Sequence, residues 1–240
     1  MSITDELGKF FAGPGSWSLN GGIPERILQH LGYTAMAVAI AAVIAVPVGL
    51  YIGHTRRFAV LAINIGNAGR ALPTLGLLTL IVTVIGIGLV PSEIALVVLA
   101  IPPLLSTSYA GIVAVDRATA DAARGVGMRE MQVLFRAEIP MALPIMLSGL
   151  RSATLQVVST ATVAAYVALG GLGRYLIDGL ANFNYGTVLG GAILVALLAV
   201  VLDLLLAGVQ RLVVSPGITG RVGRRRRTKN TSARPARSPA

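Results

Sequence analysis

The charged side chains between the two ends of this chain gather mainly in one island, residues 116–144. Asp116 can cap a short helix at 117–124, and Gly127 follows where a left-handed or extended backbone is needed. A second short helix at 128–136 is expected to close at Pro140, which removes a backbone donor and restricts Ile139. Two short helices at an angle form a rigid projection suited to docking in a groove of a soluble partner, with a solvated loop as the plainer alternative.

Two ionisable residues, Arg151 and Asp203, lie inside otherwise apolar segments. Counting about 1.5 Å per residue from the ends of those segments puts both about 13 to 15 Å deep. A lone charge at such a depth in a membrane costs on the order of 2.5 to 3.5 kcal/mol. We therefore predict an ion pair between them, structural rather than part of a gate, with Arg70 as the rival partner.

A stripe of hydroxyl and amide side chains follows one face of the apolar segment at 141–165. In a membrane such a stripe either packs against another helix or lines a wet path. Together with two residues before the island, it supplies the candidate lining of a path for solute: Thr107, Tyr109, Ser152, Gln156, Ser159 and Tyr166.

The sequence contains no pattern typical of a catalytic, metal or nucleotide-binding site. The chain has no cysteine and two histidines far apart, which gives no thiol nucleophile and no Cys-based metal site. No nucleophile, base and orienting group can be placed together. The glycines at 170–173 are not followed by the Lys-Ser or Lys-Thr of a phosphate loop. We expect no enzyme, no cofactor and no metal site.

Composition defines the setting of these residues. Hydrophobic residues make up 55% of the chain and charged residues 12%, too apolar for a soluble domain. The pattern predicts an all-α membrane protein with about five spanning helices, since about 20 apolar residues cross a bilayer. The expected spans are 31–52, 71–89, 94–115, 141–165 and 185–212, with a further helix at 58–67 on the inner side and an outer turn at Pro91, Ser92 and Glu93.

The segments flanking the spans differ in charge. Residues 1–27 form a polar N-terminal segment, outside the membrane or at its surface, and lack the layout of a cleavable signal. Residues 215–240 form an Arg-rich tail of disordered composition. The first loop, the island and this tail lie on one side, and their arginines place that side in the cytoplasm. The net charge of +10 therefore reflects topology rather than nucleic-acid binding.

The island resembles the "EAA" loop of the permease subunits of ABC importers. The matching residues are Asp121-Ala122-Ala123, Gly127 and Ile139-Pro140, with Asp121 in place of the usual Glu and Ala137 in place of an apolar Ile or Leu. Further landmarks across roughly 28–216 resemble the osmoprotectant branch of that family: His30-Leu31, Pro47-Val48-Gly49, Arg70-Ala71-Leu72-Pro73-Thr74, Tyr109-Ala110-Gly111-Ile112 and Gly170-Gly171-Leu172-Gly173.

The resemblance implies the type I permease fold over 28–214, with a coupling loop at 116–140. It implies a bacterial plasma membrane protein working with ABC ATPase subunits, an extracytoplasmic solute-binding protein and a second permease subunit, identical or not. It also implies ATPase coupling through Asp121, Ala122, Ala123, Gly127, Ile139 and Pro140. The solute would be glycine betaine, carnitine or choline. A permease of the methionine or amino-acid type, and a secondary transporter or channel needing no ATPase, are the alternatives.

Overall fold

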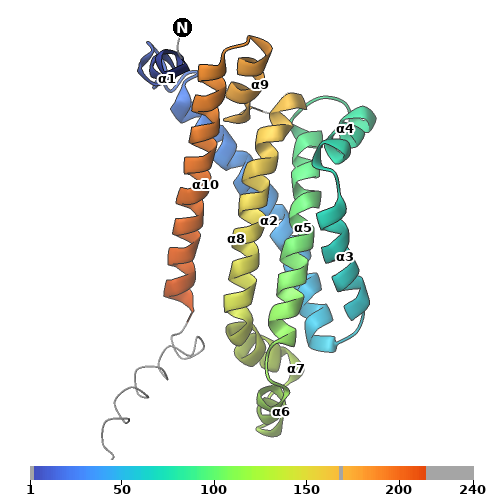
Figure 1. Cartoon of the computed structure of the whole chain (residues 1–240). Helices are drawn as coiled ribbons and strands as arrows, with labels where there is room; N and C mark the ends of the chain where they lie inside the picture. Colours follow the sequence, from blue (N-terminus) through green and yellow to red (C-terminus); the bar gives the residue numbers. More distant parts are fainter. Residues whose placement is uncertain (1–2, 168–169, 215–240) are drawn as a thin grey trace, which may run out of the picture.

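The computed structural model describes residues 3–167 and 170–214, except for the side chain of Arg70. Every regular element in this part of the chain is helical, which confirms the predicted fold class (Figure 1). The α-helices are α1 (Ile3–Ala12), α2 (Ile23–Thr55), α3 (Ala59–Ala71), α4 (Thr74–Ile85), α5 (Leu89–Val113), α6 (Arg117–Gly125), α7 (Glu130–Val133), α8 (Ile139–Ala164), α9 (Gly173–Ala181) and α10 (Tyr185–Val213), with a π-helical segment η1 (Leu134–Glu138) and a 3-10 turn η2 (Ala165–Val167).

Four helical runs in the described residues are long and apolar enough to cross a membrane. These runs are Ile23–Thr55, Leu89–Val113, Glu130–Val167 and Tyr185–Val213. The first has 33 residues, because Pro24 lies in its first turn, where no backbone donor is needed, and the helix continues until Arg56 takes a left-handed φ of 56°. The end of the polar segment predicted at 1–27 and the first predicted span, 31–52, thus belong to one helix. The boundary predicted at 27/28 falls inside it.

The second predicted span, 71–89, is not a straight helix. The chain there forms α3 and α4, which meet at an angle of 94°. Pro73 restricts Leu72 to an extended conformation, with ψ at 121°, and so ends α3. The 12 residues of α4 rise only about 18 Å, less than the roughly 30 Å of a hydrocarbon core. Taken together, α3 and α4 are apolar enough to form either a bent fifth span or a re-entrant loop.

The turn predicted at 91–93 is also wrong. Pro91, Ser92 and Glu93 lie inside the first turns of α5, where a proline costs little because the first backbone donors of a helix have no partner in it. The turn comes earlier, at Gly86 and Gly88, whose φ angles of 106° and 155° suit glycine.

The core of the bundle lies between α2, α5 and α8, with α3 and α4 on one side and α10 on the other (Figure 1). Small side chains fill the contact, which lets the helix backbones approach closely as is common in membranes. Examples with no exposed surface are Ala37, Ala41, Ala45, Ala100, Ala153 and Ala161.

The two ends of the bundle differ in what covers them. α1 and α9 lie at one end and α6 and α7 at the other (Figure 1). α1 packs against the first turns of α10, where side chains at Gly186 and Gly190 would collide with Glu6 and Phe10. Phe10 also meets Tyr175 of α9 edge to face, with ring centroids 5.0 Å apart. The N-terminal segment is therefore a docked helix, and the tail predicted at 215–240 lies outside the described residues.

Candidate functional site

The island forms the predicted projection in its first half. The Asp116 carboxylate accepts a hydrogen bond of 3.0 Å from the backbone amide of Ala118 and so caps α6. Asp121, Ala122 and Ala123 lie in the middle of this helix. Gly127 follows with a φ of 89°, while a side chain there would meet no atom within 4 Å. Glycine is therefore favoured at position 127 by the backbone conformation, and not by a lack of room for a side chain.

The second half of the island differs from the prediction. Pro140 does not close the second helix, because α7, η1 and α8 follow one another without a break. The backbone amide of Ile139 bonds to the carbonyl of Leu134, five residues back, so a π turn directly precedes Pro140. Ile139 and Pro140 are thus the first residues of the spanning helix α8.

Charged side chains tie the projection together. Arg124 in α6 bonds Glu130 of α7 through Nε and Nη2, at 2.9 and 3.0 Å, and bonds Asp121 at 2.9 Å. The hydrogen bond to Glu130 is the main cause that raises the pKa of Arg124, so this guanidinium stays charged. The arrangement holds α6 and α7 as one unit.

A residue that sequence reasoning did not assign to the site joins this cluster. His54, at the end of α2, places Nδ1 2.6 Å from Oε2 of Glu138 and Nε2 3.2 Å from Oε2 of Glu130. The Glu138 side chain is only 7% exposed, whereas that of Glu130 is 60% exposed. Nothing in the sequence pairs a histidine with a carboxylate 84 positions away. The only available signal was its place at the end of a span.

A cavity of about 220 Å³ lies within the bundle, between α3, α5 and α8. Three of the candidate path residues line it, Thr107, Ser152 and Gln156. The remaining walls come from Gly66, Gly69, Pro102, Pro103 and Ser106. None of these residues carries a charge.

The hydroxyl groups of this cavity donate their protons to their own helices. Ser106 bonds the carbonyl of Pro102 at 2.6 Å, Thr107 that of Pro103 at 2.7 Å, and Ser152 that of Ser148 at 3.1 Å. Their oxygen lone pairs therefore remain as hydrogen-bond acceptors. The Gln156 amide makes no side-chain hydrogen bond within the described residues, so both its donors and its acceptor are available.

The other three candidates do not line this cavity. Tyr109 is partly buried against the bundle core. Ser159 is exposed and its hydroxyl bonds the carbonyl of Gln156 at 3.4 Å. Tyr166 is 67% exposed in η2, at the end of α8 farthest from the projection.

Arg151 and Asp203 meet across α8 and α10. Arg151 reaches the carboxylate through Nη2, at 2.7 and 2.9 Å, and through Nε, at 3.0 Å. Gln210 extends the pair, since it accepts from Arg151 at 3.3 Å and donates to the carbonyl of Pro144 at 3.0 Å. The sequence reading did not include Gln210. The side chain of the rival partner, Arg70, lies outside the described residues.

The end of the bundle opposite the projection joins two of the sequence landmarks. His30 is fully buried with Nε2 3.0 Å from the carbonyl of Val158, and a side chain at Gly171 would lie 3.1 Å from its Nδ1. The amide of Gly171 donates to Gln29 at 2.9 Å. Gly173 packs against the carbonyl of Thr162, too close for any side chain. This end is assembled by close backbone contact.

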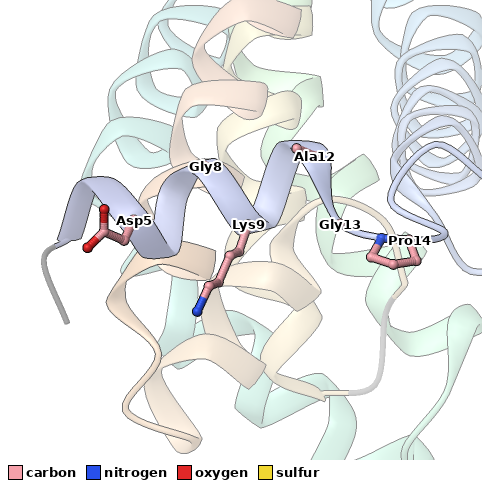
Figure 2. A pocket seen from close by; sticks show the side chains of 6 residues that line it. All are labelled: Asp5, Gly8, Lys9, Ala12, Gly13 and Pro14. Carbon is pink, nitrogen blue, oxygen red and sulfur yellow. The ribbon is translucent and has the colours of Figure 1, made fainter.

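A larger hollow, of about 600 Å³, lies beside α1. Figure 2 shows Asp5 and Lys9 projecting from successive turns of α1 at its edge. All of its lining residues belong to α1 and the loop after it, so it is a depression on the surface and not a passage between helices.

The fold and the site together define a membrane-embedded helical protein with a small polar cavity among its helices and a charged projection at one end. Residues 45–215 match the family described as "Binding-protein-dependent transport system inner membrane component". The chain belongs to this family, and it is a multi-pass inner membrane permease component.

Curated relatives cover most of the chain. It is 32% identical to the glycine betaine/carnitine/choline transport system permease protein OpuCB of Bacillus subtilis, over 80% of this chain and 88% of the relative. It is 31% identical to the choline transport system permease protein OpuBB of the same organism, over 83% and 92%. The carnitine transport permease protein OpuCD of Listeria monocytogenes is 34% identical, over 79% and 85%.

Solved structures agree with the fold. An inward-facing structure of the MetNI methionine ABC transporter superposes with a TM-score of 0.72 at 23% identity. The match covers 85% of this chain and 100% of the transporter chain. An amino acid ABC transporter gives a TM-score of 0.61 at 20% identity, over 79% and 91%. At these identities the likeness establishes the architecture and no more.

Proposed function

We propose that this chain is the permease subunit of an ATP-driven importer of a small quaternary-ammonium osmoprotectant such as glycine betaine, carnitine or choline. The observation that carries the proposal is identity of 31 to 34%, over about four fifths of the chain, to permeases that bear these solutes in their names. ABC ATPase subunits, an extracytoplasmic solute-binding protein and a second permease subunit, identical or a sister, complete the importer.

The projection made by α6 and α7 is the ATPase-docking element in this proposal. Asp121, Ala122 and Ala123 supply the contact helix, and Gly127 supplies the bend that sets its angle. Ile139 and Pro140 begin α8, so a displacement of the projection moves the base of a spanning helix directly. The positive-inside rule, applied to the arginines of the loop and the tail, supports a cytoplasmic side for this end and for the C-terminus in this proposal.

The cavity between α3, α5 and α8 is the proposed part of the solute path that lies within this subunit. A quaternary ammonium group has no N–H to donate, so hydroxyl lone pairs such as those of Ser106, Thr107 and Ser152 face its positive methyl surface favourably. The amide of Gln156 can donate to a solute carboxylate or hydroxyl. A lining without charge binds weakly enough for the solute to leave.

The test is uptake of labelled solute by cells that lack their own osmoprotectant importers. The chain is expressed with its candidate ATPase and solute-binding protein, and glycine betaine, carnitine, choline and methionine are compared. We expect uptake of at least one of the first three and no uptake of methionine. Methionine uptake alone would establish the amino-acid type, and uptake that persists without the ATPase would establish a secondary transporter.

Docking is tested separately by purification. The tagged permease should retain its ATPase subunit in detergent, and a variant lacking residues 117–127 should lose it. Retention by that variant would contradict the assignment of the docking element.

A further inference from the structure

The contact between the first spanning helix and the projection joins parts of the chain that share no covalent neighbour. The projection is connected directly to α5 through residues 114–116 and to α8 through Ile139. α2 ends at Thr55, far from it in sequence. A movement of the projection therefore reaches α5 and α8 through the backbone, but it reaches α2 only through noncovalent contacts between packed segments.

Two layers of side chains make that contact. The inner layer is apolar, with Leu50 of α2 packed against a cluster that contains Ile112, Leu134 and Ala142. The outer layer is polar, with His54 between Glu138 and Glu130 at 2.6 and 3.2 Å. Apolar packing holds two surfaces together without favouring a direction, whereas a hydrogen bond to a carboxylate fixes direction and distance.

The chemistry of the polar layer is specific to histidine. A histidine ring carries two nitrogens on different edges, so one side chain can meet a separate carboxylate with each of them. Glu138 lies on the π turn at the base of α8, and Glu130 lies on α7, where it also binds Arg124. His54 thus contacts the lower part of a spanning helix and the projection at once.

We propose that His54 is a positioning residue that locks α2 to the coupling loop, residues 116–140, so that displacement of the loop moves α2 together with α5 and α8. This inference rests on the proposed function for its transport consequence. Its structural part, a fixed distance between the end of α2 and the loop, stands without any partner protein.

The first arm of the test uses the full chain alone in lipid nanodiscs. Because the chain has no cysteine, spin labels can be placed at Arg57→Cys and Val126→Cys, both exposed positions, one beyond α2 and one in the loop. The label-to-label distance distribution should be narrow in the otherwise unchanged chain and clearly broader with His54→Ala. Equal widths would overturn the proposal, whatever the protein transports.

The second arm uses the complete importer in liposomes and measures solute imported per ATP hydrolysed. His54→Ala should lower this ratio about tenfold, the size expected for loss of a hydrogen bond to a charged group, while hydrolysis continues. His54→Asn, whose amide nitrogen replaces Nδ1, should recover most of the ratio through Glu138. A ratio unchanged in His54→Ala, or an Asn variant no better than Ala, would overturn the proposal.

A matched control comes from the same helix. His30 is also buried in α2 but bonds a backbone carbonyl at the opposite end. His30→Ala should lower the amount of assembled importer and leave solute per ATP unchanged. If His30→Ala lowers the ratio as much as His54→Ala, the effect is general damage to α2 and the positioning role is rejected. If the unaltered importer takes up none of the three osmoprotectants, the proposed function fails, and the first arm alone decides on His54.

Discussion

The two ends of the helical bundle are held by different forces. At the end bearing α1 and α9, segments pack so closely that side chains at Gly173 and Gly186 would overlap backbone atoms of Thr162 and Glu6. At the end bearing the projection, the ion pairs of Arg124 with Asp121 and with Glu130, the second of which joins α6 to α7, lie close to water. Close packing resists any displacement, whereas ion pairs near water can break and form again at little net cost. The first end is built like a fixed frame, whereas the contacts at the second end suit the moving part that we propose.

The largest effect should come from filling the frame. In Gly173→Val the new side chain collides with the carbonyl of Thr162 and, at 2.7 Å, with Ala165. Overpacking costs typically about 1 to 3 kcal/mol, and a rigid carbonyl puts this site at the upper end. The amount of folded protein recovered after detergent extraction should therefore fall by more than tenfold. Gly208→Val, on α10 where a side chain meets no atom within 4 Å, is the matched control and should be recovered normally.

The second prediction concerns Arg151 and Asp203, in the spanning region between the two ends. Removal of one partner strands the other charge, and breaking a buried pair costs about 3 to 5 kcal/mol, less here because both side chains are about a third exposed. Arg151→Met and Asp203→Leu should each lower assembly severalfold, measured by size-exclusion chromatography. The double variant should recover much of the loss. A double variant no better than the worse single one would show that the pair does more than neutralise charge.

The third prediction tests the moving end at Gly127. Its φ of 89° is strained for any residue with a side chain, at a cost of about 1 kcal/mol, but there is open space around it. Gly127→Leu should insert and assemble at normal levels while uptake per ATP falls severalfold. Gly173→Val should therefore lower the amount of folded protein, whereas Gly127→Leu should lower only the uptake per ATP. Normal uptake by membrane vesicles carrying Gly127→Leu would count against the coupling role of the bend.

The smallest effect is expected at the cavity. Gln156→Leu replaces an available amide with an apolar group of similar size, so assembly should not change and the KM for uptake should rise a fewfold. Ser159→Ala, on the same helix but outside the cavity lining, should leave the KM unchanged. Equal behaviour of the two variants would favour the packing interpretation of the polar stripe.

Sequence reasoning succeeded where one property decides the outcome. The long apolar runs predicted the all-α membrane fold, and the high cost of an isolated charge in lipid predicted that Arg151 and Asp203 would meet. The helical spacing of polar residues selected Ser152 and Gln156, but Ser159, in the same stripe, lies outside the cavity. The cavity is also lined by Gly66 and Gly69 of α3. The spacing of residues within α8 cannot predict which residues of a neighbouring helix lie opposite them.

Prediction failed where two local rules competed. The apolar run predicts one span at 71–89, but Pro73 restricts Leu72, and the chain bends there by 94°. Pro140 predicts the end of the second short helix, but a π turn precedes it and the helix continues beyond it. His54 was missed because a single histidine forms no pattern. Its partners become visible only when α2 and α8 are placed side by side.

The π turn before Pro140 also sets the direction in which the projection faces. A π turn accommodates one residue more than an α-helical turn, and each residue of an α-helix accounts for about 100° of rotation and 1.5 Å of rise. Deletion of a single residue within Leu134–Glu138 would convert this turn to ordinary α-helix and swing α6 and α7 by about that angle about the axis of α8. Permeases that differ by one residue here would present the same docking surface toward different neighbours.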